Sequence, residues 1–285
     1  MIVDDSGEDL TVEKEVLKII ESNKNIILYK NRKNLGQAGN WNRCLELAWT
    51  KWVVILHDDD MLCENYLEKV FEVAIRNDAT EVGVFQYKRD MLINDKAKKF
   101  NLCQSFAQKL LCILRRGNPF LIRQQDIFQF VVPSPGCWFI NRDEIIKTGG
   151  FDSNFEETLD GIFHFRNICN GKVLIVPQFL MIRRIEKNIF LNSEAQIKVI
   201  NMLYFFGKNF LGKYNGVKKK YYKLLLDVST VYLGNGIADK YGGNTDIKNK
   251  LLVYGINKKL VYAPKFVIFI LNCIFLFKLV FRRKI

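Results

Sequence analysis

Short apolar runs alternate with amphipathic segments along the first 185 residues, and this alternation predicts a series of strands and helices. The clearest run is Trp52–Leu56, five apolar residues that end abruptly in charged ones. Such a run is typical of a strand that is buried on both faces. Shorter apolar runs predict further strands at residues 1–3, 26–29, 82–87, 137–140 and 172–176.

Helices are predicted between these strands, where apolar residues recur at every third or fourth position. Ser6 and Asp9 resemble a helix cap with an acidic first turn, and a helix follows them. Residues 31–39 are expected to form a polar loop before further helices, which are predicted at 42–48, 64–77, 143–148 and 160–169. Because strands and helices alternate, we expect an α/β fold with a mostly parallel sheet flanked by helices.

Beyond about residue 190 the pattern is helical throughout, so a domain boundary is expected near 185–195. The predicted domains are residues 1–190 and a helical C-terminal extension, residues 191–285. Charge follows the same division: the net charge of +13 equals the excess of 16 Lys and Arg over three acidic residues in 201–285. The remaining residues are balanced in charge, and no nucleic-acid partner is expected.

The cysteines and the N-terminus point to a cytoplasmic protein. Seven cysteines contain no C-x-x-C pair, and only two histidines are present, so no zinc-site spacing can be written. Reduced thiols in the cytosol are the simplest interpretation. The first residues lack the pattern of a secretory signal peptide.

Candidate chemistry lies where predicted strands end. Asp58, Asp59 and Asp60 follow Trp52–Leu56, and carboxylates in such a position suit Mg²⁺ or Mn²⁺ with substrate phosphates. A solvated acidic turn is the alternative. Asp4 and Asp5 also follow a strand, and could accept hydrogen bonds from a nucleoside or form a helix cap.

Asp160 lies at the start of a predicted helix, where it is either a cap or a general base.

Taken in order, the motifs resemble those of the family 2 glycosyltransferases of the GT-A (Rossmann-like) fold, over roughly residues 1–185. The segments that carry the resemblance are Val3–Ser6, Asn34–Ala38, Asn40–Arg43, Leu56–Leu62, Gly136–Phe139, Gly149–Asp152, Asp160 and Arg166.

The resemblance implies a metal-dependent, inverting transfer of a sugar from a nucleotide-diphosphate sugar to a glycan or lipid-linked acceptor, in surface polysaccharide synthesis. Asp160 matches the catalytic base of the family. The metal, Mg²⁺ or Mn²⁺, is expected on Asp59 and Asp60, with Asp58 beside them. Binding of the nucleotide-sugar donor is expected at Asp4, Asp5, Asn34, Asn42 and Asp58.

Three departures from the family pattern affect this prediction. His57 replaces the first acid of the metal motif, and Leu159 replaces the glutamate that often precedes the base. The family's first strand and helix have no counterpart, so we expect an N-terminally shortened chain. A catalytically inactive, glycosyltransferase-like binding or scaffold protein is therefore an alternative, whereas a response-regulator receiver fits only the first strand end.

The basic C-terminal region suggests an anionic membrane surface as a partner. Residues 266–281 are almost wholly apolar but include Asn272 and Lys278, and are shorter than the roughly 20 residues of a spanning helix. We expect a helix that lies in the plane of the inner face of the cell membrane. The alternative is a helix docked on the catalytic domain or on another subunit.

Overall fold

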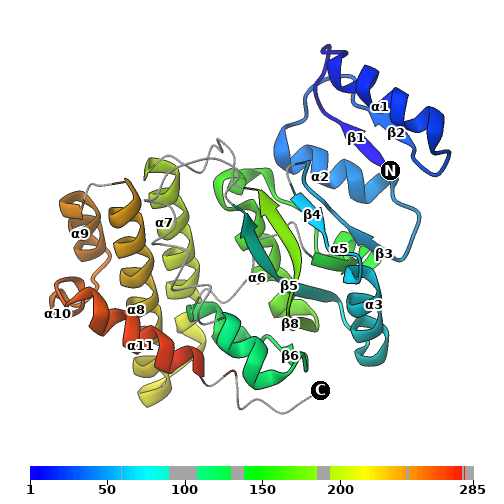
Figure 1. Cartoon of the computed structure of the whole chain (residues 1–285). Coiled ribbons are helices and arrows are strands. Elements are labelled where there is room, and N and C mark those ends of the chain that lie inside the picture. Colours follow the sequence, from blue (N-terminus) through cyan, green and yellow to red (C-terminus); the bar gives the residue numbers. More distant parts are fainter. Residues whose placement is uncertain are drawn as a thin grey trace.

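The computed structural model of the 285-residue chain describes residues 1–58, 60–89, 108–129, 138–184, 193–241, 244–277 and 279. Within these ranges the strands form two sheets, a parallel pair and a sheet of six strands. Figure 1 shows the small sheet at one end of the molecule, the large sheet in the middle and a group of helices at the other end.

The small sheet pairs β1 (Ile2–Asp4) with β2 (Leu28–Lys30), and α1 (Thr11–Ser22) connects them. None of the described side chains of α1 is buried. A two-stranded sheet is marginally stable by itself, so this unit depends on its contacts with the rest of the protein.

The large sheet is mixed. β5 and β8 are parallel, and β7 is antiparallel to both of its neighbours, so β3, β5 and β8 run in one direction. The predicted α/β class with a GT-A-like sheet flanked by helices is confirmed, but this sheet is mixed and not mostly parallel as predicted. Among its described strands only β5 and β8 pair in parallel, because β7, β4 and β6 are reversed. Its strands are, in spatial order, β3 (Trp52–Val54), β7 (Trp138–Asn141), β5 (Glu81–Arg89), β8 (Val173–Arg184) and β4 (Asp60–Leu62), while β6 (Phe120–Leu121) pairs with β8.

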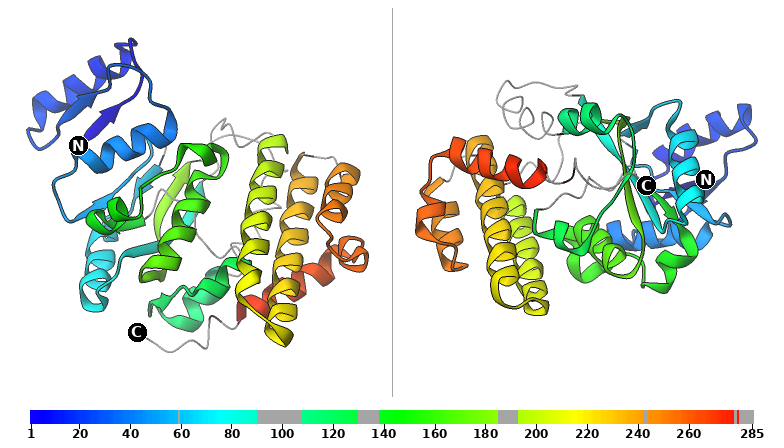
Figure 2. Two further views of the ribbon diagram at one scale, coloured as in Figure 1. Left: turned by 180° about the vertical axis from the view of Figure 1, so that it is seen from behind. Right: turned by 90° about the horizontal axis from the view of Figure 1, so that it is seen from below.

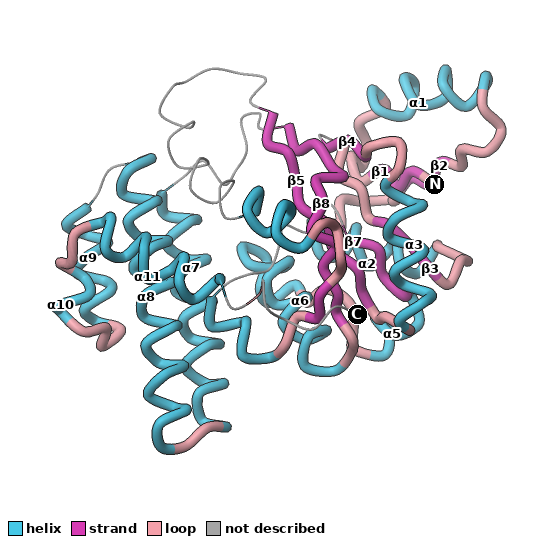
Figure 3. Tube along the Cα trace, turned by 60° about the horizontal axis from the view of Figure 1, so that its bottom comes forward, coloured by secondary structure: helices cyan, strands magenta, loops and turns pink. Residues whose placement is uncertain are grey.

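Helices pack against this sheet (Figure 3), and the side chains between them form an apolar core. Its fully buried side chains include Tyr66, Phe120, Ile140, Leu174 and Ile175. The elements around the sheet are α2 (Gly36–Leu47), α3 (Tyr66–Asn77), a helix over residues 108–115, η1 (Gln124–Gln129), α5 (Arg142–Lys147), η3 (Ser153–Thr158) and α6 (Leu159–Asn170).

The C-terminal region is helical, as predicted, and has a second apolar core around Leu225, Leu226 and Val228. α8 is its central helix and contacts α7, α9 and α11, an arrangement that Figure 2 shows from two sides. In the part of the chain that the structure describes, none of the helices is both long and apolar enough to cross a membrane. Its elements are α7 (Ser193–Phe210), η5 (Leu211–Lys213), α8 (Gly216–Tyr241), α9 (Asn244–Val253), α10 (Lys258–Val261) and α11 (Lys265–Phe277).

Two local predictions were wrong. The Ser6 hydroxyl donates to the Asp9 carbonyl, and α1 begins only at Thr11, whose N–H is bound by the Asp9 carboxylate at 2.8 Å. The second half of the predicted loop 31–39 is the first turn of α2. The Asp5 carboxylate accepts the Leu35 N–H directly before this turn, and Ala38 within it is buried, so contacts with other segments favour the helix over a loop.

Candidate active site

The Asp4 side chain is buried at the carboxyl end of β1. Only 5% of the residue is exposed, and one carboxylate oxygen accepts the Ser6 N–H at 2.9 Å. The other oxygen, Oδ2, is buried and has no hydrogen-bond donor among the described residues. A buried carboxylate oxygen without a donor is costly, and a donor from a ligand would offset that cost.

Asp5 receives hydrogen bonds from the segment that leads into α2. Its carboxylate accepts the Asn31 amide at 2.9 Å and the Leu35 N–H at 2.9 and 3.1 Å. Asn34 donates to the Asp5 carbonyl at 2.8 Å. The structure therefore brings together three predicted nucleotide-side residues, Asp4, Asp5 and Asn34.

Asn31, which was not among the residues predicted from the sequence, is 7% exposed and positions Asp5. Its amide also donates to Asn40 Oδ1 at 3.0 Å, which fixes the amide orientation. The available signal was its position, directly after the strand β2, where polar side chains of an α/β fold meet ligands.

Three consecutive residues of α2 hold three different loops. Asn40 contacts Asn31, and the Trp41 ring stacks on His57 with a centroid distance of 5.0 Å. Asn42 donates to the Phe151 carbonyl at 2.7 Å and accepts the Phe151 N–H at 2.8 Å. Both polar groups of the Asn42 amide are engaged, so this predicted nucleotide-side residue organises the loop after α5.

The predicted metal motif follows β3. Asp58 is exposed, whereas Asp60 is 7% exposed and its carboxylate lies 3.7 Å from His57 Nδ1. Asp59 lies outside the described residues, as do Gly136 and Cys137. Over the described ranges, no three or more His, Cys, Asp or Glu residues gather as a metal site would require.

The predicted base, Asp160, lies in the first turn of α6. Its side chain is partly exposed and accepts the Gly161 N–H at 2.7 Å. The preceding element, η3, packs on α2 and on α7. The Asp160 carboxylate is therefore accessible. It lies in α6, directly after η3, which packs on α2.

A buried polar cluster anchors α6 to the large sheet. His164 Nδ1 lies 2.5 Å from Glu81 Oε1, and Asn167 donates to Glu81 Oε2 at 2.9 Å. Both members of the ion pair are buried, and the Trp138 ring packs on His164 at 4.0 Å. Since Glu81 begins β5, the helix that carries Asp160 is fixed to a central strand.

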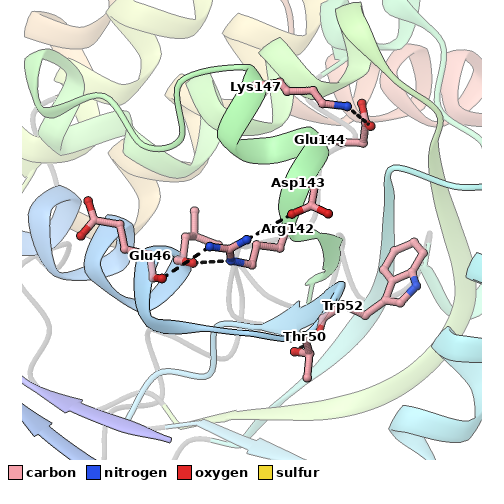
Figure 4. A network of polar contacts seen from close by, with 8 residues as sticks. Glu46, Thr50, Trp52, Arg142, Asp143, Glu144 and Lys147 are labelled. Carbon is pink, nitrogen blue, oxygen red and sulfur yellow. Dashed lines mark hydrogen bonds and ion pairs between the residues drawn. The ribbon is translucent and has the colours of Figure 1, made fainter.

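Two arginines connect the helices around the site. Arg142 donates to the Leu45 carbonyl at 2.7 Å and to the Glu46 carbonyl at 3.4 Å, at the last turn of α2 (Figure 4). These carbonyls have no partner within the helix, so the guanidinium satisfies them. Arg166 of α6 donates to the Gly150 carbonyl at 2.7 Å, which ties α6 to the loop that Asn42 holds.

Comparison of the sequence with known proteins shows which family the chain belongs to. The sequence model of the family described as "Glycosyl transferase family 2" matches residues 1–149, just over half of the chain. The chain belongs to this family. It is also 31% identical over 77 residues to the uncharacterized glycosyltransferase MJ1057 of Methanocaldococcus jannaschii, a match that spans 27% of either chain.

Solved glycosyltransferases have the same fold. TarS of S. aureus, residues 1–349, matches with a TM-score of 0.55 at 12% identity, over 95% of this family 2 chain and 70% of TarS. The mannosyltransferase PcManGT of Pyrobaculum calidifontis, in complex with GDP-Man and Mn²⁺, matches with a TM-score of 0.54 at 12% identity, over 95% and 75%. TarS has also been solved in complex with UDP-GlcNAc.

Proposed function

We propose that this family 2 glycosyltransferase moves a sugar from a nucleotide-diphosphate sugar to a hydroxyl group of a glycan or lipid-linked acceptor, with inversion at the anomeric carbon. The observation that carries the proposal is the accessible carboxylate of Asp160 in the first turn of α6, a helix that Glu81 holds to β5 through His164 and Asn167. A carboxylate held in this way suits a general base.

The reaction requires one proton transfer and one displacement. Asp160 takes the proton of the acceptor hydroxyl while the acceptor oxygen bonds to the anomeric carbon. The bond from that carbon to the diphosphate oxygen breaks, and its electron pair leaves with the nucleoside diphosphate. Attack from the face opposite the leaving group gives inversion.

The donor nucleotide is assigned to the group formed by Asp4, Asp5 and Asn34. The unsatisfied oxygen of Asp4 offers an acceptor for an N–H or hydroxyl of the nucleoside. Nucleotide sugars bound to TarS and PcManGT support a donor of this class. Asp59 and Asp60, with Asp58, would hold Mg²⁺ or Mn²⁺, which stabilises negative charge on the leaving diphosphate when bound.

The experiment compares Asp160→Asn with wild-type protein and with Asp246→Asn. Asp246 is also in the first turn of a helix, α9, and is exposed, so it is a matched control. Release of nucleoside diphosphate is measured over a panel of UDP- and GDP-sugars with Mn²⁺. We expect kcat about 10²–10⁴-fold lower for Asp160→Asn, and unchanged for Asp246→Asn. Full turnover by Asp160→Asn would exclude Asp160 as the base.

A binding or scaffold protein of the same fold is the second candidate. The observation that favours it is that the residues assigned to the nucleotide lie at the carboxyl end of the separate two-stranded sheet, whereas Asp160 lies beside the six-stranded sheet. The same panel distinguishes the two functions. A scaffold binds nucleotide without releasing diphosphate in any variant, whereas the enzyme loses turnover in Asp160→Asn and keeps its affinity for the nucleotide.

A further inference from the structure

Helix α11 is docked on the helical region by one face only. Figure 1 shows it lying across α8, on the outside of the bundle. On the docked face Ile268 is fully buried, and Asn272 is 7% exposed with its side-chain oxygen 3.3 Å from the Ser229 hydroxyl. The inner face of α11 is therefore docked chiefly on α8 of the C-terminal region, whereas the docked alternative expected from the sequence placed this segment on the catalytic domain or on another subunit.

The outer face of α11 carries a stripe of exposed apolar side chains. Phe266, Ile270 and Ile274 are 65%, 48% and 59% exposed, and their spacing of four residues places them on one side of the helix. Since these side chains contribute little to the core, their apolar character needs another explanation. We call these three residues the α11 stripe.

Lysines lie at both ends of the α11 stripe. Lys258, Lys259 and Lys265 are exposed at its N-terminal end. At the other end the Phe275 ring contacts Tyr221 at 6.2 Å, directly after the exposed residues Lys218–Lys220 at the start of α8.

Acidic side chains balance only part of this charge. Residues 201–285 contain three acids, of which Asp227 is paired with Lys223, and Asp239 with Lys265. The surface around the stripe is therefore positive, and complementary to an anionic partner.

We propose that the α11 stripe and the lysines at its two ends form a surface that docks in the plane of an anionic lipid bilayer. The thirteen residues that the structure describes in α11 reach about 20 Å, which is too short to cross a bilayer but suits a helix that lies at its interface. Apolar side chains of such a helix enter the boundary between headgroups and acyl chains, while lysines reach back to the headgroups. An apolar stripe with lysines at both ends is complementary to a bilayer, which offers acyl chains beneath anionic headgroups. It is less complementary to a protein groove, which would bury the apolar side chains alone.

The test is co-sedimentation of the full chain with vesicles of phosphatidylcholine alone, or with 30% phosphatidylglycerol. The variant Ile270→Ser with Ile274→Ser removes two stripe residues. A matched control, Leu67→Ser with Ile113→Ser, removes exposed apolar side chains (56% and 70%) from the α/β part. Thermal unfolding followed by circular dichroism establishes that each variant is folded.

We expect wild type and the control to bind the anionic vesicles alike, and the stripe variant to partition at least tenfold less. Changing Lys218, Lys219 and Lys220 to Gln should lower anionic binding about fivefold per lysine, with little effect on neutral vesicles. The proposal is overturned if wild-type protein binds neither vesicle, or if the folded stripe variant binds as wild type does. It is also overturned if the stripe variant alters only self-association in sedimentation velocity, because the stripe would then be a protein interface.

Discussion

Gly150 lies where the loop after α5 meets the amide of Asn42. Its φ is +63°, and a Cβ at this position would lie 2.4 Å from Asn42 Oδ1. A side chain is therefore excluded both by the backbone conformation and by the contact. The Gly-Gly-Phe-Asp segment owes its second glycine to the approach of α2.

This contact predicts that Gly150→Ala destabilises the protein by about 2–4 kcal/mol. The free energy of unfolding is measured by urea denaturation. Gly212→Ala is the matched control, because nothing lies within 4 Å of its Cβ position and its φ is not positive. We expect the control to change stability by less than about 0.5 kcal/mol. Equal effects of the two changes would refute the explanation.

At the scale of elements, α6 depends on a buried ion pair with β5. His164 and Glu81 are 1% and 0% exposed, and His164 Nδ1 lies 2.5 Å from Glu81 Oε1, so neither side chain can exchange its partner for water. Removing His164 leaves the buried Glu81 carboxylate with the Asn167 amide alone, and loss of one partner of a buried pair costs about 3–5 kcal/mol. Replacing both by apolar groups is much less costly.

We therefore predict that His164→Phe costs about 3–5 kcal/mol, and that adding Glu81→Leu to it restores part of the loss. A double-mutant cycle from urea unfolding measures the coupling. Asn167 loses its acceptor in the double variant, so recovery should be incomplete. If the two costs simply add, the His164–Glu81 pair does not anchor α6 to β5.

The sequence predicted most elements near the large sheet, because apolar runs bounded by turns locate buried strands. It failed where tertiary contacts override local pattern. β8 was expected to end at 176, before Pro177, yet it continues to Arg184 through a register shift against β5. Such an irregularity accommodates a proline inside a strand.

Of the candidate site, the sequence indicated some of the residues but not the contacts between them. Motifs located Asp5 and Asn34, which do lie together. The roles of Asn40, Trp41 and Asn42 could not be read from spacing, because each contacts a loop from a different part of the chain. Whether Asp160 acts as the base remains a prediction for kinetics to decide.

For the whole molecule, the two sheets should differ in local stability. β1 pairs only with β2 among the described strands, and α1 buries none of its described side chains. β5 and β8 lie inside the six-stranded sheet. Regions with few buried contacts open without global unfolding.

Amide hydrogen exchange followed by mass spectrometry tests this difference. We predict that residues 1–30 exchange at least tenfold faster than residues 81–85 and 173–182, under native conditions. Peptides from α8, which has its own buried core, serve as a slow reference. Equal protection of the two sheets would show that the small sheet unfolds only with the whole chain.

The division into two sheets has a consequence for affinity. Asp4 and Asp5 belong to the small unit, whereas Asp160 belongs to the large one, and α2 joins them through Trp41, Asn42 and the Arg142 contacts. A ligand that touches both units binds only the fraction of molecules in which they are docked, so its apparent Kd is the intrinsic Kd divided by that fraction. Substitution of Arg142, which belongs to the α2 junction but is not assigned to the nucleotide or the base, should therefore weaken binding in proportion to the undocking it causes.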